Sequence, residues 1–258
     1  MAAKKLSTIK GWNDIQNKVN LKMKNLSFLS FLSLSTVFAA VRENYDAVTP
    51  QRIDAIERIF AFYQARQITA TANNDTENEL SGPCKPVTVI FARGTGESGN
   101  VGGRNSPGPA LFSEMRMMMG SQNVAIQGVD YRADIFGYLK GGDPEGSKKY
   151  YNLTEQAASQ CPDTKIVLTG YSQGAQLAHN AARWYSLNTT QRISAAVMFG
   201  DPYAEDTLGF LPSTKVLNVC HNQDVICDGV TGGAAQHLTY AKDASEAARF
   251  IMTRIMKG

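Results

Sequence analysis

The chain has 258 residues, of which 43% are hydrophobic and 19% charged, so it is long enough to bury one sizeable core, and one domain is favoured over two. Its formal charge of +3 arises in residues 1–39, which hold six Lys and one Asp, whereas the rest carries 20 basic and 22 acidic side chains. No later cluster of Lys and Arg could follow a phosphate backbone, which argues against a nucleic-acid partner.

The N-terminal segment is typical of a secretory signal peptide. From Met23 the chain reads MKNLSFLSFLSLSTVFAAV, a lysine followed by an uncharged Leu/Phe/Ser run and small residues at Val37 and Ala39. The run of about 13 residues is shorter than the roughly 20 that span a bilayer, so a membrane anchor is the weaker interpretation. We expect residues 1–39 to be a signal peptide of a secreted, extracellular protein, with Met23 as a candidate start.

A helix and a linker are predicted before the main domain. Residues 49–67 begin with a Thr cap and Pro at the first helical position, and their Ile and aromatic residues recur on one face. The polar stretch 69–83 then predicts a linker. Residues 40–83 are interpreted as a pro-segment or as an N-terminal helix plus linker, and residues 84–258 as the main domain.

From Pro83 onward, strand-like and helical patterns alternate. Strands are predicted at 87–92, 123–129, 165–170, 195–200 and 215–220, and helices at 110–119, 147–160, 175–186 and 244–256. Because the strand runs are continuously apolar rather than alternating, they predict strands buried on both faces. The fold class is therefore α/β, a three-layer α/β/α sandwich with a mainly parallel central sheet. The four Met residues between 115 and 119 are expected to fill the core.

The cysteines indicate disulfides rather than a metal site. Four cysteines lie beyond the predicted cleavage site, with no C-x-x-C pair and no His at zinc-finger spacing. Three pairings are possible. Cys220 with Cys227 closes the short polar loop HNQDVI, which leaves Cys84 and Cys161 to close a long loop.

The segment KIVLTGYSQGAQLAHNAARWY carries the strongest chemical motif. A strand runs into Gly170-Tyr171-Ser172-Gln173-Gly174, and an Ala-rich helix follows at once, which is the context that gives G-x-S-x-G its meaning. Glycines that lack a Cβ allow the sharp strand-to-helix turn and a strained backbone at its centre. Ser172 is therefore predicted to be a nucleophile at the positive end of a helix dipole.

A serine nucleophile needs a histidine base and an acid. His179 lies seven residues beyond Ser172 on the same helix, so it is interpreted as a packed or surface histidine. In this class of fold the order is Ser, then acid, then His. His237 with Asp224 fits that order, because Asp224 lies inside the loop between Cys220 and Cys227 and can be held rigidly.

Other acids are weaker candidates. The pair Asp201 and His221 is the alternative dyad, but Asp201 precedes Pro202 and is expected to cap a turn. Asp228 could also serve His237, but it lies in a turn with Gly229.

The run RGTGESG at 93–99 matches G-x-G-x-x-G, the pattern of a dinucleotide-binding loop, but its context differs. The following residues, NVGGRNSPGP, cannot begin the helix that would bind a pyrophosphate. An oxyanion hole needs one N–H group after the nucleophile, here at Gln173, and one from a loop after an early strand. We expect Thr95 to supply the second, with Arg93 and Glu97 bracing the loop.

Taken together, six segments resemble the fungal cutinases, secreted serine esterases of the α/β-hydrolase type: VIFARGTGESGNVG, QGVDYRADIFGYLKGGDPEGS, CPDTKIVLTGYSQGAQLAHNAA, SAAVMFGDP, CHNQDVIC and AAQHLTYA. They span about residues 84–243, in the order and at the spacing of that family. The resemblance implies that Ser172 is the nucleophile, that Asp224 and His237 complete the triad, and that Thr95 and Gln173 form the oxyanion hole. It also implies disulfides between Cys84 and Cys161 and between Cys220 and Cys227.

The chain differs from that family at two places that concern substrate binding. Thr95 is followed by Gly96, where the family commonly shows Thr, and residues 228–233 are polar where the family tends to carry an aliphatic run before the catalytic histidine. The opposite lip, at 135–139, is apolar, although packing in the core explains some of these side chains equally well. The expected substrate-binding residues are Ile135, Phe136, Leu139, Val230 and Leu238.

The sequence therefore predicts a secreted, monomeric serine esterase that uses no cofactor and no metal. Its expected partner is an ester substrate, a polymer surface such as plant cutin as well as short-chain esters, with no nucleic acid and no membrane. One alternative is an acetylxylan esterase on the same fold, although those enzymes usually have more than four cysteines. Another is a non-catalytic relative that binds a surface.

Overall fold

The computed structural model describes residues 50–67, 75–227 and 234–257. The chain forms two compact units, Met1–Pro50 and Gln51–Gly258. The predicted signal peptide lies outside the described residues, and the second unit holds the sheet and the helices that cover it. Helix α3 (Pro50–Gln67) forms where the Thr-Pro start predicts a helix, and Ala55, Ile56 and Ile59 on it are buried.

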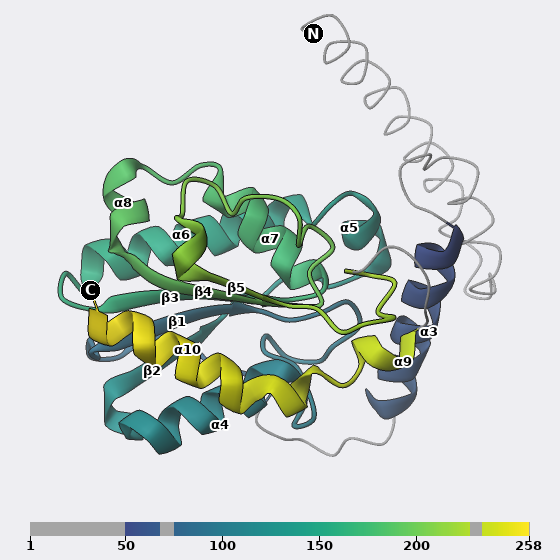
Figure 1. The fold of residues 1–258 in the computed structure, drawn as a ribbon, viewed down its shortest axis with the longest axis horizontal. Helices are drawn as coiled ribbons and strands as arrows, with labels where there is room; N and C mark the ends of the chain where they lie inside the picture. The colour runs from purple at the N-terminus through teal and green to yellow at the C-terminus, as the bar shows by residue number, and fades with distance from the viewer. Residues whose placement is uncertain (1–49, 68–74, 228–233, 258) are drawn as a thin grey trace, which may run out of the picture. The chain divides into compact units, whose positions relative to one another are not determined.

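The core is a five-stranded parallel sheet with strand order β2-β1-β3-β4-β5 (Figure 1). The strands lie within two residues of the predicted ranges: β1 is Val87–Ala92, β2 is Val124–Gly128, β3 is Lys165–Tyr171, β4 is Ile193–Phe199 and β5 is Val216–Val219. The predicted α/β class with a parallel sheet is confirmed.

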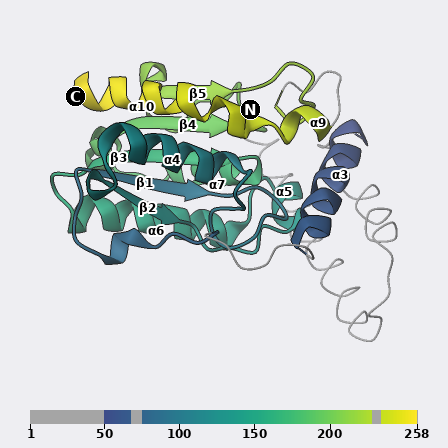
Figure 2. The same cartoon turned by 90° about the horizontal axis from the view of Figure 1, so that it is seen from below.

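Helices cover both faces of the sheet (Figures 1 and 2). On one face α6 (Pro144–Gln160) and α7 (Gln173–Ala182) pack on Ile90 and Ala92 of β1. On the other, α4 (Pro107–Met119) and α10 (Ala244–Lys257) share a cluster with Val87, Val89 and Phe91. Successive residues of a strand point to opposite faces, so both sets must be apolar, which explains the unbroken apolar runs.

The remaining elements are short. They are the helices α5 (Ile135–Leu139), α8 (Leu187–Arg192) and α9 (Ala234–His237) and the 3-10 turns η1 (Glu79–Ser81), η2 (Ser121–Asn123), η3 (Ser213–Lys215) and η4 (Tyr240–Asp243). Helices of fewer than two turns leave too few residues for a 3.6-residue repeat to be recognised. No helix among the described residues is long and apolar enough to cross a bilayer.

Residues 75–83 differ from the predicted linker, because they pack along the free edge of β2. The backbone of Asn78 bridges that of Gln127, and Gly128 N–H donates to Glu77 O at 2.9 Å. Leu80 is buried in the core. An uncovered edge strand presents unpaired backbone groups, so a polar segment that satisfies them has a structural role that composition alone does not reveal.

The Met residues of α4 divide between core and solvent. Met115 is fully buried, but Met117 is 72% exposed and Met118 37% exposed, so the prediction that all four fill the core is wrong. Neighbouring positions on a helix point about 100° apart, and only one face of α4 meets the sheet.

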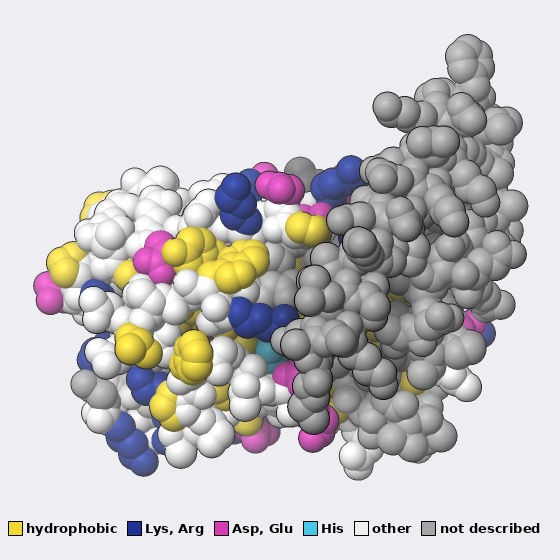
Figure 3. Space-filling model, turned by 90° about the horizontal axis from the view of Figure 1, so that it is seen from above, with side chains coloured by type: hydrophobic (Ala, Val, Ile, Leu, Met, Phe, Trp, Pro, Cys, Tyr) yellow, Lys and Arg dark blue, Asp and Glu magenta, His cyan; other side chains and the backbone are white. Residues whose placement is uncertain are grey.

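On the surface over α6, α7 and α8, side chains of different types are mixed. On the face in Figure 3, acidic and basic side chains are interspersed, and hydrophobic side chains form separate groups. The exposed apolar residues of the described chain include Trp184, Leu187 and Phe210. The described residues on this face form no continuous basic surface.

Disulfides join Cys84 to Cys161 and Cys220 to Cys227. The first ties the segment before β1 to the residue that follows α6, across a sequence separation of 77 residues. In the chain-entropy treatment, closing a loop of this length stabilises the fold by about 4 kcal/mol. The second closes the loop that follows β5 and so fixes a local conformation at the carboxyl end of the sheet.

The strand order determines where a site can form. The chain runs from β1 outward to β2 and then crosses β1 to reach β3, so the winding direction reverses between β1 and β3. Ligands of open α/β sheets bind outside the carboxyl ends of the strands at such a reversal. The loop RGTGESG follows β1 and Ser172 follows β3, so both lie at this position.

Candidate active site

Ser172 occupies a strained turn between β3 and α7. Its φ is 55° and its ψ is −120°, a backbone conformation that L-residues rarely adopt. A Cβ on Gly170 would lie 2.6 Å from the carbonyl oxygen of Gly174, and one on Gly174 would overlap the carbonyl oxygen of Ala92. Only glycines fit beside this turn, which is why G-x-S-x-G marks it.

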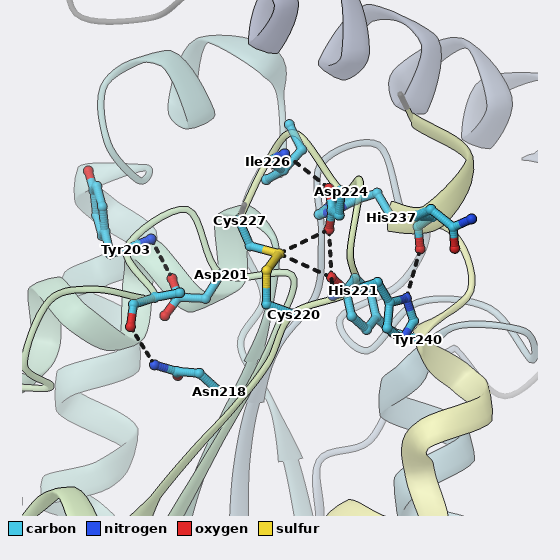
Figure 4. The surroundings of a disulfide bond; sticks show 12 residues. Asp201, Tyr203, Asn218, Cys220, His221, Asp224, Ile226, Cys227, His237 and Tyr240 are labelled. Atoms are coloured by element: carbon cyan, nitrogen blue, oxygen red, sulfur yellow. Dashed lines mark hydrogen bonds and ion pairs between the residues drawn. A yellow bond between two sulfur atoms is a disulfide. The ribbon is translucent and has the colours of Figure 1, made fainter. Parts of the chain in front are cut away.

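His237 and Asp224 form a buried pair (Figure 4). His237 Nδ1 lies 2.7 Å from Asp224 Oδ2, and both side chains are 0% exposed. Asp224 comes from the disulfide loop after β5, and His237 ends α9. The spacing of 13 residues lets two consecutive loops meet at the carboxyl end of the sheet.

The Asp224 carboxylate is held in the charged form. Burial would raise its pKa, but the positive charge and hydrogen bond of His237, a hydrogen bond from Tyr240 and the amide of Ile226 together lower that pKa below its usual range. The Ile226 N–H donates to Asp224 Oδ1 at 3.0 Å. A charged acid in this position can orient an imidazole and stabilise its protonated form.

His237 is packed against Tyr171, the residue that precedes Ser172. The Tyr171 ring stacks on the His237 ring with centroids 5.0 Å apart, and the Tyr171 hydroxyl donates to His237 O at 2.8 Å. Ser172 N–H donates to Phe199 O at 3.0 Å, and the next residue, Gly200, lies against the His237 ring.

Three buried polar side-chain atoms of this site lack a partner among the described residues, Gln173 Oε1 and the two considered next. Ser172 Oγ and His237 Nε2 are both buried and have no hydrogen-bond partner among the described residues. Buried polar atoms without partners are rare in folded proteins, and a catalytic role is one of the explanations for them. They are the two atoms between which a proton would pass if Ser172 acted as a nucleophile.

The other two histidines have different partners. His179 Nε2 lies 2.8 Å from Asp201 Oδ2, and both side chains are buried, so His179 is a packed histidine as the sequence predicts. His221 Nε2 lies 2.7 Å from Asp243 Oδ2. The structure therefore separates Asp201 from His221, the alternative dyad.

Asp201 caps a turn, as the sequence predicts. Its Oδ1 accepts the Tyr203 N–H at 2.9 Å, a turn that begins just before Pro202. Asp228, another acid considered from the sequence, lies outside the described residues.

Thr95 and Gln173 lie side by side. Gln173 Nε2 donates to Thr95 Oγ1 at 2.8 Å and to Asp134 O at 2.7 Å, and both Thr95 and Gln173 are 0% exposed. Gln173 is the first residue of α7, and the N–H groups of a first helical turn have no partner inside the helix. Because Thr95 Oγ1 accepts from Gln173, its own O–H remains able to donate.

The loop that carries Thr95 is braced from inside the protein. Arg93 Nε donates to Glu97 O at 2.8 Å and its Nη2 to Tyr131 O at 2.7 Å. Glu97 Oε2 accepts the Gly94 N–H at 2.8 Å. Arg93 and Glu97 are 5% and 4% exposed, so these two side chains support the loop from buried positions.

The expected substrate-binding residues fall into three groups. Ile135 and Leu139 on α5 are buried, which agrees with core packing as the explanation for these two. Phe136 and Leu238 are half-buried and remain candidates. Val230 lies outside the described residues.

Sequence reasoning missed Tyr240 and Tyr171, whose hydroxyls bond to Asp224 and to the backbone of His237. Tyr171 stands beside Ser172 in the motif, and Tyr240 lies three residues after His237. Neither spacing has a known chemical meaning, so only the folded structure identifies these contacts.

Two cavities lie away from Ser172. One of about 440 Å³ is at the amino ends of β3 and β4, where Lys165, Arg192 and Ser194 line it. Another of about 290 Å³ adjoins the second disulfide and the loop Pro202–Asp206. Ser172 itself is 1% exposed, and neither cavity includes it.

Comparison with known proteins agrees with this geometry. The cutinase family model matches residues 83–255. A cutinase of Blumeria hordei is 50% identical over 231 residues, which cover 89% of this chain and 98% of the relative. The solved structure of a Trichoderma reesei cutinase in complex with a C11Y4 phosphonate inhibitor superposes with a TM-score of 0.69 at 34% identity, and covers 85% of this chain and 98% of that one.

A solved acetylxylan esterase is more distant, with 22% identity, a TM-score of 0.54, and coverage of 67% of this chain and all of that one, which shows a shared fold alone. The match of the family model and the 50% identity establish the family as well as the fold. This chain belongs to the cutinase family, and it is a serine carboxylic ester hydrolase.

Proposed function

We propose that Ser172 is the nucleophile of this esterase, with His237 as its base and Asp224 as the acid that holds His237. The observation that carries the proposal is the combination of a serine in a strained strand-to-helix turn with a buried His–Asp pair packed on the neighbouring residue. The unpartnered Ser172 Oγ and His237 Nε2 support it, because the mechanism uses both atoms.

The first step forms an acyl-enzyme. His237 Nε2 takes the Ser172 proton as Oγ bonds to the ester carbonyl carbon, and the carbonyl electrons move to oxygen. The backbone N–H groups of Gln173 and Thr95 stabilise that oxyanion, aided by the Thr95 hydroxyl. When the carbonyl re-forms, the alcohol leaves with the proton from His237.

The second step releases the acid. Water gives a proton to His237 Nε2 and attacks the acyl carbon, and collapse of the second intermediate returns that proton to Ser172. In both steps the imidazole becomes positively charged. Asp224 stays ionised beside it because its pKa is lowered, so the charge pair is ready before the reaction begins.

We infer that the substrates are aliphatic polyesters of the cutin type and short-chain esters. The support is the cutinase identity of the relatives, at 50% in sequence and 34% in a solved structure. The half-buried Phe136 and Leu238 are the apolar side chains we assign to the acyl chain. The acetylxylan esterase alternative rests on a fold match at 22% identity, which says nothing about substrate.

We also infer that the protein is secreted. Two disulfides join all four cysteines, and structural disulfides are characteristic of oxidising, extracellular environments. The signal-like sequence between Met23 and Ala39 agrees with this.

Replacing Ser172 by Ala should lower kcat for p-nitrophenyl butyrate by roughly a million-fold, because catalytic triads act as a unit. His237→Ala and the double variant should lose a similar amount. As a control, His179→Gln breaks the other buried His–Asp pair outside the site and should keep turnover within a few-fold. Undiminished turnover by folded Ser172→Ala would refute the mechanism, and absence of turnover by the native chain would favour a surface-binding protein.

Substrate class is tested with p-nitrophenyl esters from acetate to palmitate, run beside cutin and acetylated xylan. We expect release of hydroxy fatty acids from cutin and activity on butyrate at least equal to that on acetate, because an apolar acyl site favours added methylenes. Deacetylation of xylan without attack on cutin would promote the acetylxylan esterase alternative.

The charge on Asp224 predicts a pH dependence of stability. A carboxyl whose pKa is lowered by folding adds stability that is complete above its unfolded pKa, about 3.9, and is lost as pH falls through the folded value. The free energy of unfolding in urea should therefore differ between the native chain and Asp224→Asn at pH 5, and this difference should shrink as the pH falls below about 4. A difference that grows as the pH falls would contradict the lowered pKa.

A further inference from the structure

Tyr240 occupies the centre of the contact between the two loops that carry Asp224 and His237. It lies three residues after His237 at the start of η4, and its side chain is fully buried. In Figure 4 its ring lies beside His221 and its hydroxyl points toward the Asp224 carboxylate.

The hydrogen bonds of Tyr240 have one possible direction. Its hydroxyl oxygen lies 2.6 Å from Asp224 Oδ2 and 3.0 Å from the His221 backbone nitrogen. The amide can only donate and an ionised carboxylate can only accept, so the phenol hydrogen goes to Asp224. Burial and the neighbouring Asp224 carboxylate raise the pKa of Tyr240, so this hydrogen stays in place.

Both oxygens of Asp224 are thereby fixed. Oδ1 accepts the Ile226 N–H, and Oδ2 accepts from His237 Nδ1 at 2.7 Å and from Tyr240 at 2.6 Å. Without the phenol, the oxygen that faces His237 would keep a single donor among the described residues. We infer that Tyr240 is a positioning residue of the esterase. It holds Asp224 Oδ2 in line with His237 Nδ1 and reduces the negative charge on that oxygen.

A second His–Asp pair supports Tyr240 from behind. The His221 ring stacks on the Tyr240 ring with centroids 4.1 Å apart and 18° between their planes. His221 Nε2 lies 2.7 Å from Asp243 Oδ2, and its Nδ1 lies 3.1 Å from Gln236 O. Gln236 and Asp243 bracket the segment that carries His237 and Tyr240, so His221 fastens this segment to the disulfide loop.

Among the described residues, the titratable groups around the phenol come from the disulfide loop, η4 and α9. Asp224 and His221 approach it from the disulfide loop, Asp243 from the end of η4 and His237 from α9, whereas Tyr171 and Phe199 on β3 and β4 are uncharged. A hydrogen bond from the phenol draws negative charge from Oδ2. Its loss should leave more charge facing His237 and so stabilise the protonated imidazole.

This inference rests on the proposed function and is tested with Tyr240→Phe, which keeps the ring. We expect kcat for p-nitrophenyl butyrate to fall about ten-fold, with KM little changed, since small misplacements of catalytic groups cost rate rather than binding. The acid limb of the kcat profile should move to higher pH by about half a unit. A kcat within about two-fold of the native value, or an unmoved acid limb, would overturn the inference.

Tyr171→Phe is the matched control. It removes an equally buried phenol that bonds to the backbone of His237 and not to the carboxylate. Its acid limb should stay where the native one lies. An equal shift in both variants would mean that any loosening around His237 has this effect, and would overturn a specific role for Tyr240.

A second variant tests the inference even if Tyr240→Phe folds poorly. Site-specific 3-fluorotyrosine at position 240 keeps the size and the hydrogen bond but is a stronger donor, so the acid limb should move to lower pH, opposite to Tyr240→Phe. A shift to higher pH would overturn the inference. Failure of the proposed function is recognised separately, because turnover would then survive Ser172→Ala, whatever happens at position 240.

Discussion

A charged carboxylate buried among aromatic rings must be surrounded by hydrogen-bond donors. This constraint determines how the loops that carry Asp224 and His237 are arranged. Asp224 is 0% exposed, and its pKa is lowered despite burial because His237, Tyr240 and the Ile226 amide all donate to it. These donors come from three successive parts of the C-terminal region. The disulfide between Cys220 and Cys227 fixes the loop on which the carboxylate sits, so its partners can meet it at a defined place.

The mechanism we propose also needs a second constraint, which shapes the turn that carries Ser172. The carboxyl end of β3 turns into α7 through two glycines for which no larger residue fits, and the serine between them adopts a positive φ. Tyr171 and Phe199, at the ends of adjacent strands, connect this turn to the His237 loop through ring contacts and backbone hydrogen bonds. Strand order therefore brings the turn at Ser172 and the loop of His237 together, although they are far apart in sequence.

Much of this is visible in the sequence, and the exceptions have physical causes. Continuously apolar strands predict the parallel sheet to within two residues, and G-x-S-x-G between strand and helix predicts the turn at Ser172. Residues 75–83 could not be predicted, because a polar segment that covers a sheet edge resembles a linker in composition. The Met residues of α4 were placed wrongly because sequence alone did not show which helix face meets the sheet. Tyr240 was missed because its role depends on a tertiary contact with Asp224 rather than on any local pattern.

Activation of Ser172 by His237 is tested most directly by mapping where a fluorophosphonate bonds to the native protein, using mass spectrometry of its peptides. Only a serine whose proton is taken by a nearby base reacts quickly with such a phosphorus electrophile. We predict a single adduct on Ser172 that forms rapidly in the native chain and far more slowly in His237→Ala. An adduct on another serine, or equal labelling of Ser172 in the two proteins, would contradict the claim that position 237 activates position 172.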